Sequence, residues 1–282
     1  MAGNFWADLH EGLGAIYDRY EDPNELGAAV ASLRLTYRGM GNSGVSPDFD
    51  SNLVRDAYAL AYHPGHAYSY LEIFTKHPVG TAILRNLKAS SKIGVIGAGC
   101  GAETLGLLHF LREHYFLVKD MTIGFFDRAD WSQQRERSFF YPLRLLCGQS
   151  QPKIDSVTGD LVASQDANIV RSFVTGCDLL FCSALFTEIP HGTKRDDSFL
   201  KILDALEVGS QLCIIDETNV ASFSHWLRVL ASNPRMRNLD TGSIVFRVPP
   251  PPTWLQSHVL NFQGVQWPRF KYELSWILLE KL

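Results

Sequence analysis

The chain has 282 residues, of which 46% are hydrophobic and 20% charged, and its formal net charge is −4. This length allows one large domain with additions or two small domains, and the acidic balance argues against a strongly basic nucleic-acid-binding protein. Residues 1–6 lack the basic start and apolar core of a signal peptide, and no apolar run reaches the roughly 20 residues of a membrane span. We therefore expect a soluble, cytoplasmic protein without membrane contact.

The first ninety residues are predicted to be helical. Residues 4–20 place apolar side chains three and four positions apart, which is the spacing of one helix face, and residues 23–37 repeat this more weakly. Residues 39–49 are rich in glycine and polar side chains and are expected to form a loop. Ser46 or Asp48 is a candidate N-cap for a further helix.

Four aromatic residues at the end of this region follow one another at intervals of four: Tyr58, Tyr62, His66 and Tyr70. They would share one face of a continuous helix, although Pro64 and Gly65 predict that the helix bends or restarts. In one interpretation the three tyrosines bind the substrate and His63 or His66 is a base. In the other they form a buried aromatic seam that packs the helices onto the rest of the protein. Residues 1–90 are thus predicted to form a helical cap or lid.

From residue 92 onward, short β-rich runs alternate with helical ones, which predicts βαβ units and a doubly wound parallel sheet. The last two strands, residues 243–248 and 272–281, have no predicted helix between them and should be antiparallel neighbours. We predict an α/β fold for residues 91–282: a doubly wound seven-stranded sheet with five parallel strands and a C-terminal antiparallel pair. The parallel strands are expected at residues 92–98, 121–127, 152–160, 177–186 and 210–219.

The first strand leads directly into a glycine-rich loop, in the segment KIGVIGAGCGAETLGLL at residues 92–108. Gly97, Gly99 and Gly101 give the pattern Gly-x-Gly-x-Gly. Glycine permits a tight turn, and without a Cβ its backbone can touch a ligand. Read with Ala102 in place of Gly101, the same loop matches the dinucleotide fingerprint Gly-x-Gly-x-x-Ala. The loop therefore leaves two cofactor classes open.

The short motifs after each strand and the closing antiparallel pair resemble class I S-adenosylmethionine-dependent methyltransferases, over roughly residues 90–282. The resemblance implies that S-adenosyl-L-methionine is the cofactor, with its methionine part over the glycine loop and its ribose hydroxyls on Asp127. It implies that TGDL, after the third strand, meets the adenine, and that CSALFTEI, residues 182–189, faces the methyl acceptor. The residues expected to bind the cofactor are Gly97, Ala98, Gly99, Gly101, Glu103, Asp127, Arg128, Asp160, Leu161 and Ser183.

The sequence departs from this family's pattern in two places. Family members often carry an acid two positions before the first glycine, where it helps bind the cofactor amine. Here that residue is Val95, so the amine must be held by backbone carbonyls, by Glu103 or by Glu188. No NPPY or DPPY motif follows the fourth strand, which argues against methylation of an exocyclic amino group on a nucleobase. Candidate bases for removing a proton from the acceptor are His66, Glu188 and His191.

Several assignments stay open at this level. Asp127 or Asp130 could cap the helix that begins near Trp131 instead of binding a ligand. Transfer of a methyl group to a small molecule is the leading function, because it fits the acidic balance and the aromatic cap. The alternatives are an RNA (rRNA) base methyltransferase, an NAD(P)-dependent oxidoreductase, and a methyltransferase-like protein that binds without turnover. An RNA-binding patch would consist of Arg128, Arg135, Arg137 and Arg144.

The five cysteines are scattered and form no Cys-x-x-Cys pair. This spacing predicts neither a disulfide framework nor a structural zinc site, and no metal is expected. Cys100 lies in the glycine loop, where a role as a nucleophile is not favoured. Most of the others read as small buried apolar residues: Cys147, Cys177, Cys182 and Cys213.

Overall fold

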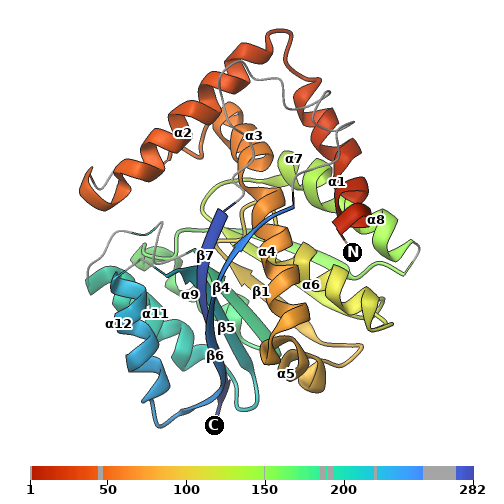
Figure 1. Ribbon diagram of the computed structural model, residues 1–282. Coiled ribbons are helices and arrows are strands. Elements are labelled where there is room, and N and C mark those ends of the chain that lie inside the picture. Colours follow the sequence, from red (N-terminus) through yellow and green to blue (C-terminus); the bar gives the residue numbers. More distant parts are fainter. Residues whose placement is uncertain are drawn as a thin grey trace.

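The computed structural model describes residues 2–43, 47–148, 150–184, 189, 193–218, 221–249 and 271–282. A seven-stranded sheet with helices on both faces forms the centre of the molecule (Figure 1). The strand order is β3-β2-β1-β4-β5-β7-β6. The strands are β1 (Lys92–Ile96), β2 (Thr122–Asp127), β3 (Lys153–Thr158), β4 (Leu179–Ser183), β5 (Gln211–Glu217), β6 (Met236–Arg247) and β7 (Lys271–Lys281).

The pairing within the sheet confirms the predicted fold class. β1 to β5 pair in parallel, whereas β7 lies antiparallel between β5 and β6. The order of the parallel strands reverses between β1 and β4, and ligands of doubly wound sheets bind at such a switch point, beyond the carboxyl ends of the strands. Any cofactor site is therefore expected where β1, β2 and β4 end.

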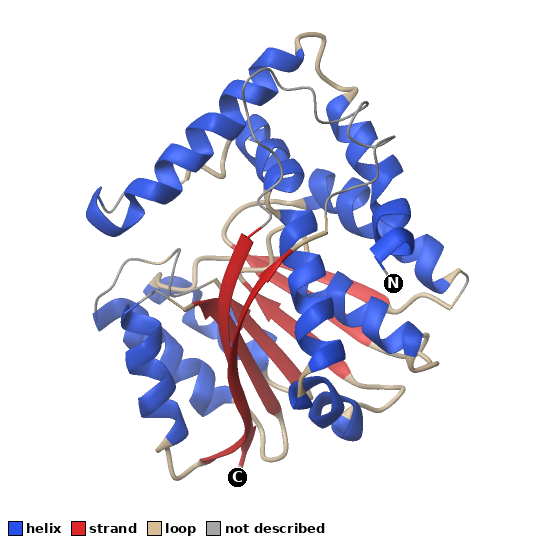
Figure 2. Ribbon diagram, in the orientation of Figure 1, coloured by secondary structure: helices blue, strands red, loops and turns tan. Residues whose placement is uncertain are grey.

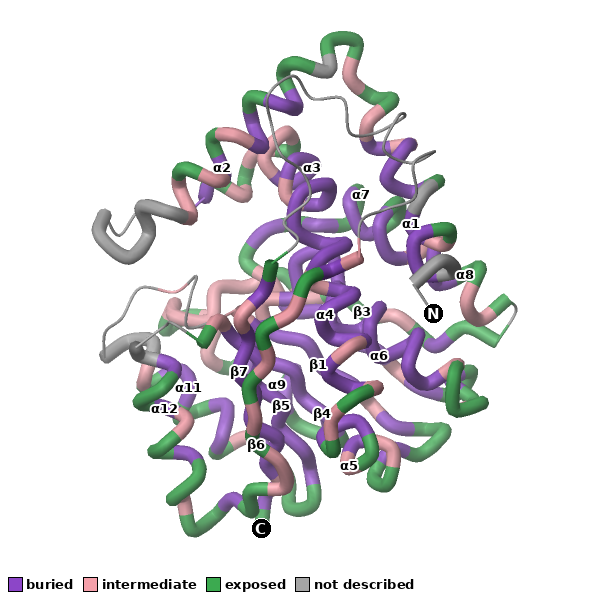
Figure 3. The backbone as a smooth tube through the Cα atoms, viewed as in Figure 1, coloured by how far each residue is buried: buried purple, intermediate pink, exposed green. Residues whose placement is uncertain are grey.

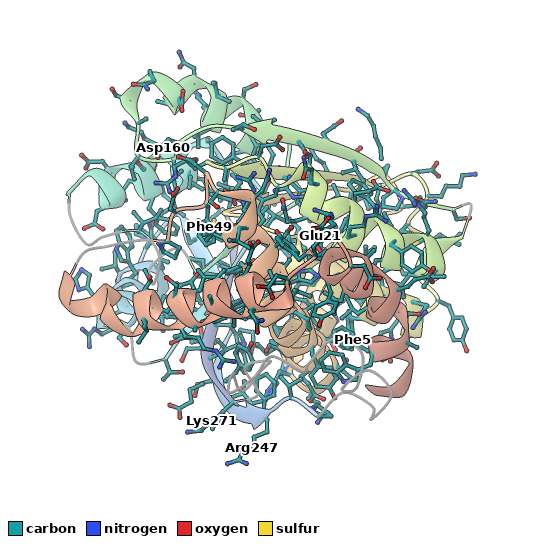
Figure 4. The ribbon with its side chains drawn as sticks, turned by 90° about the horizontal axis from the view of Figure 1, so that it is seen from above. Phe5, Glu21, Phe49, Asp160, Arg247 and Lys271 are labelled. Carbon is teal, nitrogen blue, oxygen red and sulfur yellow. The ribbon has the colours of Figure 1, made fainter. Side chains whose placement is uncertain are left out.

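The helices fall into an N-terminal group and a group that connects the strands (Figure 2). The N-terminal group is α1 (Ala2–Tyr17), α2 (Pro23–Ser43), α3 (Asn52–Ala61), α4 (His63–Lys76) and α5 (Pro78–Asn86). The connecting helices are α6 (Ala102–Glu113), α7 (Ser132–Arg135), the π-helix η1 (Glu136–Phe140), α8 (Tyr141–Cys147), the 3₁₀ turn η2 (Ser164–Asp166), α9 (Ala167–Val174), α11 (Thr193–Ala205) and α12 (Ala221–Ala231). α2 lies across the end of the molecule when it is seen from above (Figure 4).

The N-terminal helices share an apolar core with the sheet. Side chains from α1 to α6 and from one face of the strands form one cluster, and α9, α11 and α12 cover the other face. Phe74 of α4 contacts Phe181 of β4, with 5.9 Å between the ring centroids. Buried residues accordingly run from the sheet through α4 and α6, while α2 alternates between buried and exposed positions (Figure 3). The division at residue 90 into a cap and a catalytic domain stays a prediction.

Three elements differ from the sequence-based expectation. α2 runs on to Ser43, into the segment expected to be a loop, and α5 forms a separate helix after His77, within a region that was expected to be helical only as a whole. Pro78 stands in the first turn of α5, where a missing N–H costs no hydrogen bond. β6 begins at Met236 rather than Ser243, because it pairs with β7 along its whole length. The early part of this edge strand is polar and mostly exposed, so its sequence has no strong apolar alternation.

No helix within the described ranges is both long enough and apolar enough to span a lipid bilayer.

Candidate cofactor site

The glycine loop has the backbone conformation that its sequence requires. It begins where β1 ends and leads into α6, as expected, and Gly97, Gly99 and Gly101 have φ angles of 69°, 47° and 81°. Residues with a Cβ rarely adopt such positive φ values, so glycine is favoured at each of these three positions. The N–H groups of Gly97 and Ala98 donate to the Phe126 carbonyl of β2, at 2.9 and 3.2 Å. The loop is thus fixed to the end of the neighbouring strand.

Asp127 ends β2 and holds the loop through its carboxylate. Its Oδ2 accepts a hydrogen bond from the Gly99 N–H at 2.8 Å, and its Oδ1 accepts one from the Ala129 N–H at 3.0 Å. The contact at the start of α7 comes from Asp130, whose Oδ1 accepts from the Ser132 N–H at 2.9 Å. This hydrogen bond lowers the pKa of the Asp130 carboxyl. Asp130, one residue before the N-cap Trp131, therefore contacts the start of α7, whereas Asp127 faces the glycine loop.

Arg135 holds the same glycine from the opposite side. Its Nε donates to the Gly99 carbonyl at 2.8 Å, and its guanidinium lies 4.6 Å from the centre of the Phe125 ring. The side chain is buried, with 4% exposed. Sequence reasoning placed Arg135 in a surface patch, which is wrong, because the residue lies beneath the loop. Only its spacing of four from Trp131 on one helix could have signalled a buried position.

Glu103, in the first turn of α6, is a buried acid beside the loop. It is 5% exposed, and its Oε2 has no hydrogen-bond partner among the residues that the structure describes. Burial raises the pKa of this carboxyl to about 7. The Ser183 hydroxyl, at the end of β4, lies against both Glu103 and Tyr70. Burial, and then the charge of Glu103, raises the pKa of the Tyr70 phenol. Expected cofactor and substrate residues thus meet in one polar cluster.

The four aromatic residues spaced by four do line up, although the helix is interrupted. α3 ends at Ala61 and α4 begins at His63, with Pro64 in its first turn, so the predicted restart is confirmed. The His66 ring is 6.3 Å from both Tyr58 and Tyr62, 6.4 Å from Tyr70 and 5.3 Å from Tyr272, measured between centroids. Tyr62 and Tyr70 are almost fully buried, as a packing seam would be. Their substrate-binding role stays a prediction.

Aromatic side chains also cover the loop from the side of the N-terminal helices. Phe49, Tyr58 and Trp131 form a triangle with centroid distances of 5.1 to 5.4 Å. Of these three, Tyr58 approaches Gly99, since its Cε1 is 3.8 Å from where a Cβ of Gly99 would lie. Trp131 is buried, and its Nε1 lacks a hydrogen-bond partner within the described part of the chain. These residues bring the N-terminal helices into contact with the glycine loop.

The loop after β3 carries Asp160 and Leu161. Asp160 Oδ1 accepts from the Val162 N–H at 2.9 Å, and the Asp160 N–H donates to Asp166 Oδ2 at 2.7 Å. Leu161 lines a cavity of about 700 Å³ that extends between α9 and α11. Sequence reasoning did not anticipate this cavity, because it depends on how two helices distant in the chain pack together.

The remaining candidates are only partly placed. Glu188 and His191 lie outside the described residues. Arg128 and Arg137 are exposed, whereas Arg144 pairs with Glu136 at 2.5 Å. With Arg135 buried as well, the four arginines do not form one exposed basic patch.

Cys100, the cysteine of the glycine loop, is buried. Burial raises the pKa of its thiol well above the ordinary value, so it is kept neutral and unreactive.

No protein-family model matches the sequence, and no curated protein matches it. Similar solved structures include an rRNA methylase from Streptococcus thermophilus, with 15% identity and a TM-score of 0.40, covering 73% of this chain and 98% of that chain. The N-methyltransferase NodS from Bradyrhizobium japonicum, in complex with S-adenosyl-L-homocysteine, has 11% identity and a TM-score of 0.45, covering 90% and 98%. The C-terminal domain of precorrin-6Y C5,15-methyltransferase from Rhodobacter capsulatus has 12% identity and a TM-score of 0.39, covering 72% and 89%.

Values this low carry no conclusion about substrate or residues. The strand order, with β7 antiparallel between β5 and β6, and the glycine loop that follows β1 define the fold by themselves. The likeness to these solved methyltransferases is one of fold alone.

Proposed function

We propose that this protein is an S-adenosylmethionine-dependent methyltransferase that acts on a small-molecule acceptor. The observation that carries the proposal is the Gly99 peptide, which is tied to the carboxylate of Asp127 at 2.8 Å beside the topological switch point. A backbone held this way leaves the open face of the glycine loop available to a ligand. It also sets an acid at the end of β2, where ribose hydroxyls would need an acceptor.

The residues around the loop fit this cofactor. Each oxygen of Asp127 accepts one backbone hydrogen bond and keeps lone-pair capacity for a ribose hydroxyl. Around it, Gly97, Ala98 and Gly101 would give the ligand backbone contact. The other proposed contacts are Arg128, Asp160, Leu161 and Ser183.

Glu103 would hold the amine of the cofactor's methionine part. The position often occupied by an acid in this family is Val95, which is fully buried in β1 and cannot ionise. Glu103 instead provides a buried carboxylate oxygen without a partner among the described residues. A cation placed beside it would stabilise the ionised form and complete its hydrogen bonding.

When bound, S-adenosyl-L-methionine supplies a sulfonium methyl group, which an acceptor lone pair attacks in line as the carbon–sulfur bond breaks. The chain's own residues need only align the acceptor, exclude water and remove a proton where the acceptor carries one. We propose that the aromatic rings of Tyr58, Tyr62 and Tyr70 align the methyl acceptor. His66, whose ring lies among these three tyrosines, is a candidate base, together with Glu188 and His191.

A small acceptor is favoured over RNA for two reasons. Of the four arginines that could have formed an RNA-binding patch, Arg135 is buried and Arg144 pairs with Glu136, so only Arg128 and Arg137 are left as exposed candidates that form no ion pair within the described part of the chain. Aromatic residues from the N-terminal helices also stand over the loop, with Tyr58 next to Gly99. Aromatic cover of this kind over the loop suits a molecule smaller than a folded nucleic acid.

The proposal is tested by incubating the protein with S-adenosyl-L-methionine labelled in its methyl group. Small-molecule extracts and total RNA are offered as acceptors in separate reactions. Label in small molecules supports the proposal, and label in RNA alone would replace it with the rRNA alternative. Binding of the cofactor without label in either pool would indicate a protein that binds without turnover.

A further inference from the structure

We infer that Arg135 is a positioning residue for the cofactor loop, and that the neighbouring Gln134 couples the loop to the seating of the N-terminal helices. The ligand in this inference is that of the proposed function. Neither Arg135 nor Gln134 is assigned a direct contact with the cofactor, and we expect cofactor affinity to depend on a contact within the N-terminal helices.

The Gly99 peptide is held at both ends. Its N–H donates to Asp127, and its carbonyl accepts from Arg135 Nε, each at 2.8 Å. Arg135 is fixed in turn by Phe125 beneath its guanidinium and by Ser156 Oγ at 3.4 Å from Nη1. A glycine with φ of 47° has wide conformational freedom unless its two polar groups are tied. Loss of the arginine would leave this peptide tied on one side only.

Gln134 precedes Arg135 and reaches the other way, to the N-terminal helices. Its side chain is fully buried, and Nε2 donates to Asp56 Oδ1 at 2.7 Å. The Asp56 carboxylate, 1% exposed, also accepts from the Tyr20 hydroxyl at 2.7 Å and from Arg19 Nη1 at 3.3 Å. One buried carboxylate of α3 thus connects the turn between α1 and α2 with α7.

The π-helix that follows Arg135 strengthens the same connection. His63 of α4 lies with its Nε2 3.0 Å from the Ser138 carbonyl. Gly12 of α1 runs so close to this segment that a Cβ there would overlap the Arg137 carbonyl oxygen. Single-turn π-helices often occur at functional sites, where they interrupt regular packing. Here α1, α3 and α4 all contact one short segment, whose first residues clamp the glycine loop.

Adjacent residues on one helical turn cannot move independently. If the Asp56 contact is weakened, Gln134 loses a buried partner, and the turn that carries Arg135 can shift away from the Gly99 carbonyl. Coupling between two sites requires such a shared element, which both sites bias. Packing of the N-terminal helices against α7 should therefore raise affinity for the cofactor. Cofactor binding should in return protect the amides of these helices from hydrogen exchange.

The test measures binding of S-adenosyl-L-homocysteine by calorimetry to the full chain and to Asp56→Asn. The matched control is Asp8→Asn, because Asp8 also joins an N-terminal helix to the core, but its carboxylate partners are Arg112 at 3.5 Å and His109 at 3.8 Å, both in α6, rather than Gln134. Asp56→Asn should weaken binding about tenfold, within the usual range of coupling between sites. Asp8→Asn should change it less than about twofold, because additivity of distant sites holds to a few tenths of a kcal/mol.

A double-mutant cycle identifies the route. In the Arg135→Met background, Asp56→Asn should have no further effect on affinity, whereas Arg135→Lys should restore part of the binding lost in Arg135→Met. If the effects of Asp56→Asn and Arg135→Met simply add, the coupling does not pass through Arg135 and the inference is overturned. If Arg135→Met does not fold, Arg135→Lys replaces it in the cycle, and simple addition of its effect to that of Asp56→Asn again overturns the inference.

Hydrogen exchange separates this inference from the proposed function. In the protein without ligand, Asp56→Asn should speed amide exchange in residues 97–101, and Asp8→Asn should not. If the wild-type chain binds neither sulfur cofactor, the proposed function fails, but the exchange result still decides the coupling. Equal exchange in both variants would contradict the coupling even where the cofactor binds.

Discussion

The N–H of Gly99 donates to the Asp127 carboxylate at 2.8 Å, so the acid expected to hold the ribose also holds the loop expected to carry the methionine part. A single side chain thereby links the ends of β1 and β2. Removing it should harm the loop and the ligand contact together, which distinguishes it from the neighbouring acid.

Asp127→Ala should weaken binding of S-adenosyl-L-homocysteine by about ten- to a hundredfold. A hydrogen bond to a charged group contributes about 1.5–3 kcal/mol, and each 1.4 kcal/mol corresponds to a factor of about ten. Asp130→Ala is the matched control, since its contact is the helix start at Ser132. It should cost about 1 kcal/mol of folding stability and leave affinity nearly unchanged. Thermal melting without ligand and calorimetry with ligand measure both effects, and equal affinities for the two variants would assign Asp127 a structural role only.

Gly99→Ala should fold but lose most of its affinity for the cofactor. The added Cβ meets Tyr58 at an ordinary 3.8 Å, so the protein itself has room for it, while the ligand-facing backbone would be covered. Gly176→Ala is the control, because Gly176 also has a positive φ, 75°, and a Cβ there meets nothing within 4 Å. Both variants should lose about 1–2 kcal/mol of stability from backbone strain. Normal cofactor binding by Gly99→Ala would show that the glycine serves the turn alone.

Glu103→Gln should stabilise the ligand-free protein at pH 8 and weaken cofactor binding. Burial raises the folded-state pKa of Glu103 to about 7 from an ordinary 4.5. The contribution of this carboxyl to folding stability is therefore fully present below about pH 4.5 and is lost as the pH rises through 7. The melting temperature of the variant should exceed that of the wild type at pH 8 and approach it at pH 5.

Affinity provides the second half of this prediction. If Glu103 holds the cofactor amine, wild-type affinity should increase from pH 6 to pH 8 as the carboxyl ionises, and binding should release protons. The pH dependence should be much reduced in Glu103→Gln. The same pH dependence of affinity in both proteins would mean that another residue, such as Glu188, holds the cofactor amine.

His63 should make the protein sensitive to acid. Burial lowers the pKa of its ring to about 4 from 6.5, so the unfolded state takes up the proton first as pH falls. The stability linked to this histidine is complete above about 6.5 and is lost towards pH 4, in total on the order of 3 kcal/mol. His63→Gln keeps a donor for the Ser138 carbonyl but cannot titrate. Urea unfolding between pH 7 and pH 4.5 should show a shallower loss in this variant, and an unchanged slope would contradict the assignment.

Local patterns in the sequence predicted much of the fold. The alternation of strands and helices after residue 92 and the glycines after β1 depend on neighbouring residues, and both are reproduced. The restart of the helix near Pro64 also follows from local chemistry, since proline suits a first turn. The early start of β6 does not, because pairing with β7 supplies stability that a polar edge strand does not signal.

The site shows the same limit. Asp127 could be predicted because it ends a strand, whereas the burial of Arg135 depends on Phe125 and on the Gly99 carbonyl, which reach it only in the folded chain. An arginine among polar neighbours on a helix looks like a surface residue. The close contact of α4 with the sheet is equally non-local, so the spacing of Phe74 alone could not predict that it packs against Phe181 of β4.

The central claim is tested most directly by calorimetric titration of the wild-type protein with S-adenosyl-L-homocysteine and, separately, with NADH. We predict a dissociation constant in the micromolar range for the sulfur cofactor and no measurable binding of NADH. Micromolar binding of NADH, with none of either S-adenosyl-L-methionine or S-adenosyl-L-homocysteine, would contradict the account and favour an oxidoreductase.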